Sequence, residues 1–310
     1  MRGEPLKASR VSITVVVDNV IDIFLQDQHP IRYPRPGRCS SLLAEQGLSI
    51  WIEIEGPGRS GSCRILYDFG RGGPALRRNL EILEIDPRRA DYLILSHGHI
   101  DHYGGLTGLL EDKSVCAPLV VHPRAFGSRA IRQPDGSMAG PWSIFQDEIE
   151  SLMSQPLLPA LSPRQIGSGV WISGFIPRSS TLDPLFSAAV RKEGDDWVAD
   201  QFEDDLSIFI RLEKAGLVII TGCCHAGVIN TLRAASTLFP GEPIFALIGG
   251  FHLNFVPSEA VKRIINEIDK HQPGLLVPLH CTGAAAQNLL RQHFKERCPY
   301  TTVGMNISVP

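Results

Sequence analysis

The chain has 310 residues, and 43% of them are hydrophobic, which is enough for a sizeable core in one large domain or two smaller ones. Thirty Lys and Arg residues against 33 Asp and Glu residues give a formal net charge of -3. No run of like charge is long enough to attach the chain to nucleic acid or to an anionic membrane. Apolar segments also stay below the roughly 18 residues that a membrane-spanning helix requires. The composition therefore predicts a soluble globular protein with no nucleic-acid or membrane partner.

The N-terminal segment and the cysteines point to a cytoplasmic protein. The apolar run at residues 11–17 ends after seven residues at Asp18 and Asn19, so we expect no signal peptide. The seven cysteines are an odd number and lack the spacing of a disulfide framework. No Cys-x-x-Cys pair is present, which argues against a structural zinc knuckle. Reduced thiols in a cytoplasmic protein are the expectation.

Short strands separated by turns dominate the first 122 residues. β-branched and apolar runs predict the strands, and apolar residues at helical spacing after glycine-rich turns predict the helices. The predicted elements are strands at residues 11–17, 49–55, 64–68, 91–95 and 115–122, a helix at 75–83, and a helix that begins within the glycine-rich stretch 104–110. A sheet assembled largely from local hairpins is expected here.

Residues 123–200 are irregular and rich in Pro, Gly and Ser. The pattern predicts one helix near residues 144–153 and one strand near 170–175. Long irregular stretches in compact domains are commonly lids or binding loops. Two interpretations stay open, namely a lid over a functional site and an insertion without a function.

The C-terminal half repeats one theme, in which a strand ends in a glycine-rich turn with a histidine and a helix follows. The predicted elements are strands at residues 206–212, 217–221, 243–248 and 275–278, and helices at 228–238, 258–271 and 284–294. The histidines of the three turns are His225, His252 and His280. Loops at the strand ends of one layered sheet lie side by side, so these side chains are expected to converge. A structural role is the alternative for each, and it is preferred for histidines without this setting: His29, His122, His271 and His293.

Four possible metal ligands lie within six residues directly after the predicted strand 91–95. They are His97, His99, Asp101 and His102. In an extended turn, the two imidazoles that are two residues apart point the same way, while the other two side chains turn toward a second point nearby. One loop could therefore serve two metal ions. The alternative, a solvated turn without ligands, gains nothing from gathering imidazoles beside a carboxylate.

This motif, together with Gly104-Gly105, resembles the metallo-β-lactamase superfamily. Asp68, at the end of an upstream strand, resembles the carboxylate of that superfamily's first motif, which orients a loop of metal ligands. The resemblance implies an α/β fold, a four-layer αββα sandwich, that spans residues 1–310 as a single domain. The stretch 123–200 is then an irregular lid or insertion.

Further segments resemble one branch of the superfamily, the dihydropterin-ribofuranosyl-aminobenzene phosphate synthases and related metal-dependent hydrolases. These segments are residues 204–206, 221–232, 249–253 and 278–283, together with Asp18-Asn19. One position departs from the superfamily pattern, because Cys223-Cys224-His225 follows Gly222 where many members have an aspartate that bridges two metals.

The resemblance implies two ligand sets. His225 would complete a set with His97 and His99, and a second ion would be held by Asp101, His102 and His280. Cys224 and Cys281 flank these ligands, and we interpret them as small buried residues, with a metal-binding thiolate as the alternative.

Neutral imidazoles and carboxylates favour zinc, as one or two ions, with manganese or iron as alternatives. A metal-bound water whose pKa falls from about 16 toward roughly 7 supplies hydroxide for attack on a phosphoryl or acyl centre. Asp101 would bind metal and accept the proton of the water, and His252, if it is not a ligand, would donate a hydrogen bond to developing negative charge. The predicted function is a metal-dependent hydrolase or related transferase that acts on a small, anionic, phosphorylated or heterocyclic metabolite at a phosphodiester or ester bond.

Two other classes of function stay open. A metal-bound oxygen or redox protein would be expected to have a carboxylate-rich di-iron site. Here a histidine stands where a bridging aspartate would help di-iron chemistry, and no flavodoxin-like domain follows. A non-catalytic, metal-stabilised binding module would need a coordinatively closed ion. We prefer the hydrolase.

Overall fold

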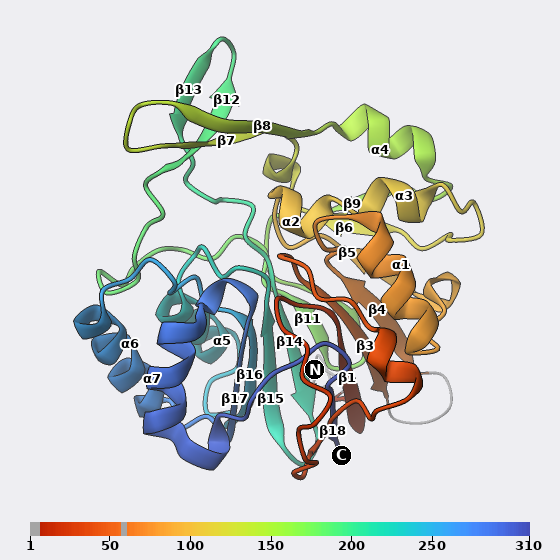
Figure 1. The fold of residues 1–310 in the computed structure, drawn as a ribbon, viewed down its shortest axis with the longest axis vertical. Coiled ribbons are helices and arrows are strands. Elements are labelled where there is room, and N and C mark those ends of the chain that lie inside the picture. Colours follow the sequence, from red (N-terminus) through yellow and green to blue (C-terminus); the bar gives the residue numbers. More distant parts are fainter. Residues whose placement is uncertain (1–6, 57–60) are drawn as a thin grey trace, which may run out of the picture.

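The strands of the computed structural model, which describes residues 7–56 and 61–310, form two large sheets packed face to face (Figure 1). Helices cover the outer face of each sheet, so that the layers follow one another as helix, sheet, sheet and helix. The α/β fold with a four-layer αββα sandwich, predicted from the resemblance, is confirmed. The first six residues of the N-terminal segment lie outside the described ranges.

The first sheet is antiparallel at one end and parallel at the other. In its described part it has eight strands, in the spatial order β2 (Ile31–Arg32), β18 (Asn306–Val309), β1 (Arg10–Val17), β3 (Ser49–Glu55), β4 (Cys63–Tyr67), β5 (Tyr92–Ile94), β6 (Leu119–Val121) and β9 (Leu157–Pro159). Strands β4, β5, β6 and β9 are parallel to one another. The carboxyl ends of β4 and β5 therefore meet at one edge of the sheet, which brings Asp68 next to the loop that begins at Ser96.

The second sheet carries the repeated histidine turns. Its strands, in spatial order, are β10 (Arg164–Gly167), β11 (Val170–Ile172), β14 (Ser207–Leu212), β15 (Gly216–Thr221), β16 (Ile244–Gly250) and β17 (Leu275–Leu279). Strands β15, β16 and β17 are parallel, and a histidine follows the end of each: His225, His252 and His280. Because parallel strands end at the same edge, the three turns lie side by side, as the repeated pattern predicts.

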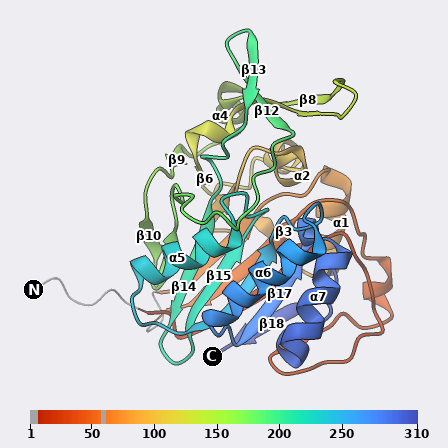
Figure 2. The ribbon, with the colours of Figure 1, turned by 90° about the vertical axis from the view of Figure 1, so that its left-hand side faces the viewer.

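Amphipathic helices close the two outer layers. Those against the first sheet are α1 (Gly73–Ile82), α2 (Ile100–Tyr103), α3 (Leu106–Leu110) and α4 (Gln146–Leu152), and those against the second are α5 (Val228–Leu238), α6 (Ser258–Lys270) and α7 (Ala284–Phe294). Short 3₁₀ helices complete the described elements: η1 (Arg38–Ser41), η2 (Pro87–Arg89), η3 (Pro123–Ala125), η4 (His280–Thr282) and η5 (Lys295–Arg297). Figure 2 shows α5, α6 and α7 in front of the second sheet. None of the helices in the described ranges has the length and apolar character needed to cross a membrane.

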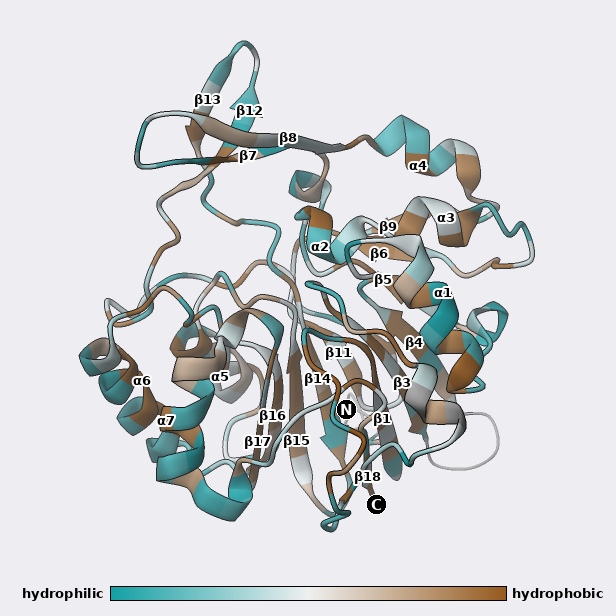
Figure 3. Ribbon diagram, in the orientation of Figure 1, coloured by the Kyte–Doolittle hydropathy of each residue, from teal (hydrophilic) through white to brown (hydrophobic). Residues whose placement is uncertain are grey.

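Alternation of side chains along the strands produces the central core. In β3, Ile50, Ile52 and Ile54 face the opposing sheet, whereas Trp51 faces the helices. The opposing sheet contributes Ile208 and further aliphatic side chains to the same cluster. Apolar residues accordingly concentrate on the central strands, while polar residues cover the outer sides of the helices (Figure 3). The interior thus fixes the registers of the strands whose ends carry the histidines.

Residues 123–200 contain more regular structure than their composition predicts. A third, antiparallel sheet of four strands stands at the histidine end of the sandwich, at the top of Figures 1 and 2, in the order β13 (Asp196–Ala199), β12 (Ala189–Glu193), β7 (Gly127–Arg132) and β8 (Met138–Ile144). The expectation of an irregular region is wrong for these strands. Gly140 and Pro141 lie within β8, and the side chains of β8 and β13 are mostly exposed or half-buried, so these two strands lack the apolar pattern typical of strands. The predicted helix and strand of this region are confirmed as α4 and β11, with shifted ends.

Candidate metal centre

Three histidines from two different loops form the first cluster of possible ligands. His97 and His99 follow β5, His225 follows β15, and one ligand atom of each lies within 4.8 Å of the others. Within the described structure, the Nε2 atoms of His97 and His225 are buried without a hydrogen-bond partner. Buried polar atoms in folded proteins nearly always have a partner. This donor set therefore fits a cation that the three imidazoles would share.

A second cluster adjoins the first. Asp101 and His102 lie in α2, His280 begins η4, and their ligand atoms also lie within 4.8 Å of one another. His280 Nε2 is 3.3 Å from Asp101 Oδ2. The ring centroids of His97 and His102 are 4.2 Å apart, so the two clusters share a border. All six residues predicted as metal ligands are brought together at one edge of the sandwich, in the two sets that the resemblance implies.

Asp68 orients the first histidine loop. Its Oδ1 atom accepts the backbone N–H of Ser96 at 2.7 Å, and its Oδ2 atom accepts the Ser96 hydroxyl at 2.7 Å. The same Oδ2 atom is 2.6 Å from His102 Nδ1. The Ser96 hydroxyl in turn lies 2.8 Å from His97 Nδ1. Because the Nδ1 atoms of both histidines are engaged, their Nε2 atoms are left to face the clusters.

The end of the first strand holds His280 in place. The backbone N–H of His280 donates to Asp18 Oδ1 at 2.8 Å, and its Nδ1 atom lies 3.1 Å from Asn19 Oδ1. Asn19 also donates from Nδ2 to the His280 carbonyl at 3.3 Å. His280 has a positive φ of 47°, a conformation that non-glycine residues adopt rarely and that surrounding contacts must maintain. Asp18 and Asn19, noted in the sequence only as part of a motif, therefore position a candidate ligand.

Two consecutive aspartates, to which the sequence gives no role, support one histidine loop each. Asp204 Oδ2 accepts the backbone N–H of Gly98 at 2.8 Å. Asp205 Oδ2 accepts the backbone N–H of Ala226 at 2.9 Å. Burial raises the pKa of Asp205 to about 7. The signal in the sequence is the acidic pair directly before the apolar strand β14, at the base of both loops.

Cys223 is the residue of the site that sequence reasoning misses. Its Sγ atom lies 3.1 Å from His102 Nε2, and it groups with His97 and His102 and also with His280 and Cys281. Cys281 is therefore not the purely packed residue that the sequence predicts, since it also lines a cavity at the site. Cys224 fits the packing interpretation, because its Sγ atom lies 3.3 Å from Thr231 Oγ1 inside the core cluster under α5.

His252 lies beside the clusters. None of the groups of described residues that could hold a metal ion includes it. Its ring stands between that of His225, with centroids 4.3 Å apart, and that of Phe186, with centroids 4.9 Å apart. Burial lowers the pKa of His252 to about 4, so its imidazole is neutral at pH 7. His252 thus lies outside the groups of possible ligands and at the wall of a cavity, and its contact with a substrate stays a prediction.

One member of each cluster, His99 of the first and Asp101 of the second, lines a cavity of 730 Å³. One wall consists of His99, Asp101 and His252, and the third sheet supplies another through β7 and β8. Its lining also includes three arginines and three aromatic residues: Arg71, Arg129, Arg132, Trp142, Phe186 and Phe255. The cavity thus combines possible ligands, positive charge and aromatic surface.

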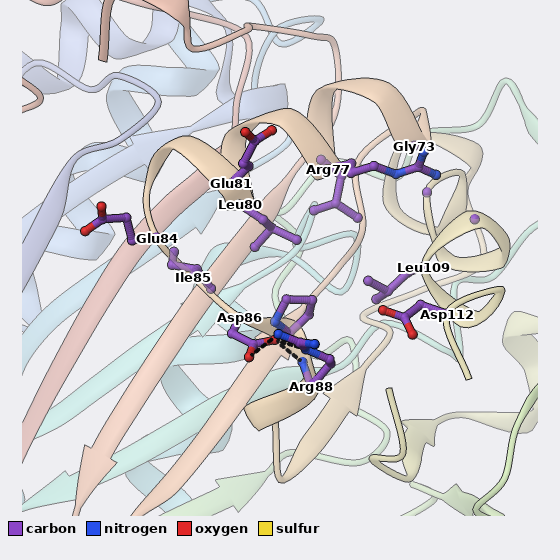
Figure 4. Close-up of a pocket in the computed structure, with 14 residues that line it drawn as sticks. Gly73, Arg77, Leu80, Glu81, Glu84, Ile85, Asp86, Arg88, Leu109 and Asp112 are labelled. Carbon is purple, nitrogen blue, oxygen red and sulfur yellow. Dashed lines mark hydrogen bonds and ion pairs between the residues drawn. The ribbon is translucent and has the colours of Figure 1, made fainter. Parts of the chain in front are cut away.

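A second cavity, of 380 Å³, lies on the outer side of the sandwich between α1 and α3 (Figure 4). The Arg88 Nε atom pairs with Asp86 Oδ1 there at 2.7 Å, in an exposed setting. No histidine or cysteine lines this cavity within the described residues. Of these two cavities, only the one beside the histidine clusters is lined by possible metal ligands.

The four histidines for which a structural role is preferred lie outside both clusters. His122 Nδ1 accepts the backbone N–H of Arg124 at 3.1 Å. His293 Nε2 lies 3.1 Å from Asp269 Oδ2 on the surface of α7. The glycine-rich turn setting therefore separates the clustered histidines from the others.

The metal-free protein should lose stability as the pH falls below about 6.5. Burial, and then the charge of Arg129, lower the pKa of His99 to about 3, and burial lowers that of His252 to about 4. The unfolded chain binds protons at these residues from about pH 6.5, so acid favours unfolding, while the stabilisation is complete above that pH. We expect the free energy of unfolding in urea to fall by roughly 2 to 4 kcal/mol between pH 7 and pH 5. The variant His252→Ala should show a shallower fall, and a flat profile for the wild type would contradict the expectation.

Comparisons with known proteins agree with this geometry. The family model of the metallo-beta-lactamase superfamily matches residues 44–164, which include the first histidine loop. The crystal structure of Tm1679, a metal-dependent hydrolase of the beta-lactamase superfamily, superposes with a TM-score of 0.76 at 22% identity, covering 96% of this chain and 99% of that chain. At this level of identity the superposition shows the shared fold.

Two proteins of Methanocaldococcus jannaschii are similar over most of their lengths. One is named 7,8-dihydropterin-6-methyl-4-(beta-D-ribofuranosyl)-aminobenzene-5'-phosphate synthase, and it is 30% identical over 264 residues, or 84% of this chain and 88% of that protein. The other, named uncharacterized protein MJ0448, is 31% identical over 257 residues, or 81% of this chain and 89% of that protein. The chain therefore belongs to the metallo-β-lactamase superfamily, in the branch of the dihydropterin-ribofuranosyl-aminobenzene phosphate synthase-like proteins.

Proposed function

We propose that the chain is a metal-dependent hydrolase, or a related group transferase, that acts on a small anionic metabolite at a phosphodiester or ester bond. The observation that carries the proposal is that two adjoining sets of possible ligands each contribute one residue, His99 and Asp101, to the wall of a cavity large enough for a metabolite. A ligand-lined cavity of this kind is typical of a catalytic metal site, whereas a structural metal is coordinatively closed. The similarity to a protein named as a synthase keeps group transfer within the proposal.

Zinc is the proposed metal, with manganese or iron as alternatives for the second set. The imidazoles of His97, His99 and His225 are neutral donors of the type that zinc prefers. Asp101 adds a carboxylate oxygen to His102 and His280, a set that harder ions also accept. A bound zinc ion supplies a coordinated water whose pKa falls from about 16 to roughly 7, which makes hydroxide available at neutral pH.

We propose that Asp101 accepts a proton in the reaction and that His252 stabilises negative charge on the substrate. Asp101 Oδ2 accepts a hydrogen bond from Gln46 Nε2 at 3.1 Å and lies at the wall of the cavity, where it would bind metal and accept the proton of the attacking water. His252 faces the same cavity as a neutral imidazole, so it would donate a hydrogen bond to negative charge that develops on the substrate.

The cavity walls support a substrate that combines a flat ring with an anionic group. The rings of Phe186 and Phe255 are stacked, with centroids 5.7 Å apart and an interplanar angle of 7°, and Trp142 lines the same cavity. Arg71 and Arg132 add positive charge there. The compound in the name of the similar Methanocaldococcus jannaschii protein likewise combines a dihydropterin with a ribofuranosyl group and a phosphate. We propose that the third sheet acts as a lid over such a substrate. We also propose that the protein is cytoplasmic, since the described cysteines are free thiols, as expected in a reducing compartment.

Removal of metal should abolish turnover, and zinc should restore it. We expect chelated protein to show no activity on a panel of chromogenic phosphodiesters and esters, and reloading with zinc, manganese or iron to identify the active metal. His252→Gln should keep its full metal content but lose roughly 10²- to 10³-fold in kcat, because the neutral donor is displaced.

Two results would contradict the proposed function. One is turnover that persists unchanged after complete chelation. The other is a bound metal without any exchangeable water, which would identify a binding module in place of an enzyme.

A further inference from the structure

We propose that Gln46 is a positioning residue that fixes the carboxylate of Asp101 and joins it to Arg71, which would bind the anionic group of the substrate. The inference rests on the proposed function, since it requires that Asp101 hold a metal ion. Gln46 Nε2 donates to Asp101 Oδ2 at 3.1 Å, and Arg71 Nη1 donates to Gln46 Oε1 at 3.2 Å. All three residues line the same cavity.

The two partners of Gln46 determine which way its amide group faces. A guanidinium can only donate hydrogen bonds, so the amide oxygen lies toward Arg71 and the amide nitrogen is left for Asp101. An amide nitrogen also can only donate, so Asp101 Oδ2 is the acceptor of that hydrogen bond. Gln46 therefore restrains the rotation of the Asp101 carboxylate without placing a charge beside it.

Backbone contacts hold the loop 45–48 in place. The backbone N–H of Leu48 donates to the Asp101 carbonyl at 3.2 Å. A Cβ atom at Gly47 would lie 2.8 Å from the Arg71 nitrogen and 2.8 Å from the Asp101 carbonyl oxygen, so only glycine lets the loop approach this closely. The loop is therefore fixed against both partners of the glutamine side chain.

The same loop reaches a second ligand of the second set. The backbone N–H of Gly47 donates to Asn19 Oδ1 at 3.4 Å. This oxygen also lies 3.1 Å from His280 Nδ1, and His280 Nε2 is in turn 3.3 Å from Asp101 Oδ2. The loop 45–48 thus supports two ligands of the second set, and a change in it should affect that set selectively.

Arg71 extends this series of hydrogen bonds toward the substrate. Arg71 is exposed, whereas the side chain of Asp101 is 14% exposed, so Gln46 joins a surface guanidinium to an inner ligand. A guanidinium has five N–H donors, so one can stay on Gln46 while two others pair with a phosphate or a carboxylate. An anionic group bound there would fix Arg71 and, through Gln46, the orientation of Asp101.

Zinc titration of the metal-free protein measures the affinity of each ligand set without a substrate. The binding step that disappears in His280→Ala reports the second set, and the step that disappears in His99→Ala reports the first. Gln46→Met keeps the length of the side chain and removes both hydrogen bonds. It should weaken the second-set step by roughly 10- to 100-fold and leave the first-set step unchanged. Gln133→Met, at the wall of the same cavity, is the matched control and should leave both steps unchanged.

A double variant tests the link through Gln46. Arg71→Met should also weaken the second-set step, and the double variant Gln46→Met, Arg71→Met should bind zinc no more weakly than Gln46→Met alone, because the effect of Arg71 passes through the amide. Turnover of an anionic chromogenic ester adds a second readout. Arg71→Met should mainly raise KM, whereas Gln46→Met should mainly lower kcat.

Several outcomes would overturn the inference and leave the proposed function intact. They are wild-type zinc affinity at the second set of Gln46→Met, equal weakening of both steps, and additive effects of the two substitutions on the second-set step. A wild type that binds a single ion would have the same consequence, because no second ion would be positioned. A wild type that binds no metal would overturn both the inference and the proposed function.

Discussion

His99→Ala should lose the metal of the first ligand set and nearly all activity. His99 is one of three imidazoles whose ligand atoms lie within 4.8 Å of one another, so two neutral ligands would remain, fewer than zinc sites in proteins provide. We expect metal content at this set to fall below detection after gel filtration. Turnover should decrease by roughly 10³-fold or more, because the lowered pKa of a coordinated water would be lost.

The position of His99 makes this substitution easy to interpret. Its side chain is partly exposed and lines the cavity, whereas His97 is fully buried among Ser96 and His102. Truncation of His99 therefore disturbs the core less than truncation of its neighbour. The matched control is His293→Ala, a histidine on the surface of α7 that should keep both metal and activity. Elemental analysis that finds unchanged metal in His99→Ala would refute the assignment of the first set.

The arrangement of strands around the site can be predicted from the sequence, because it follows from the repeated pattern of apolar strand, glycine-rich turn and helix. Three apolar strands, each followed by a glycine-rich turn and a helix, predict parallel neighbours whose ends share one edge. The structure places β15, β16 and β17 in that arrangement, with His225 and His280 beside the loop after β5. Because these strands are buried on both faces, they appear in the sequence as continuous apolar runs and can be recognised there.

Two features escape sequence reasoning for different physical reasons. In the third sheet, the side chains of β8 and β13 are mostly exposed or half-buried, so these strands lack the apolar alternation that identifies half-buried strands. Cys223 follows a glycine at the end of a buried strand, and in the sequence it is indistinguishable from the small packed residue that Cys224 is. Its contact with His102 spans 121 positions and appears only when both halves of the fold are assembled.

A buried ion-pair network joins the third sheet to the metal loop. Arg129 in β7 is 3% exposed, and it donates from Nε to Asp200 Oδ2 at 2.8 Å and from Nη2 to Asp204 Oδ2 at 2.9 Å. It also donates from Nη1 to the carbonyls of Ala125, at 2.7 Å, and of Gly98, at 3.3 Å. Because Asp204 accepts the backbone N–H of Gly98, both polar groups of that residue depend on the network.

Arg129→Met should therefore lower the free energy of unfolding by about 3 to 5 kcal/mol, because it leaves two buried carboxylates without their partner. Urea unfolding of the metal-free protein at pH 7.5 measures this loss. Arg132→Met, at the exposed end of the same strand, is the control and should stay within about 0.5 kcal/mol of wild type.

Neutralising the stranded carboxylates should recover part of the loss. The triple variant Arg129→Met, Asp200→Asn, Asp204→Asn removes both buried charges, so it should regain about half of the lost free energy. Its metal affinity should nevertheless stay weakened, because the Gly98 carbonyl no longer has the Arg129 donor. Equal stability of Arg129→Met and the wild type would show that the two carboxylates become hydrated or share a proton once Arg129 is removed. The third sheet would then be anchored to the metal loop by packing rather than by charge.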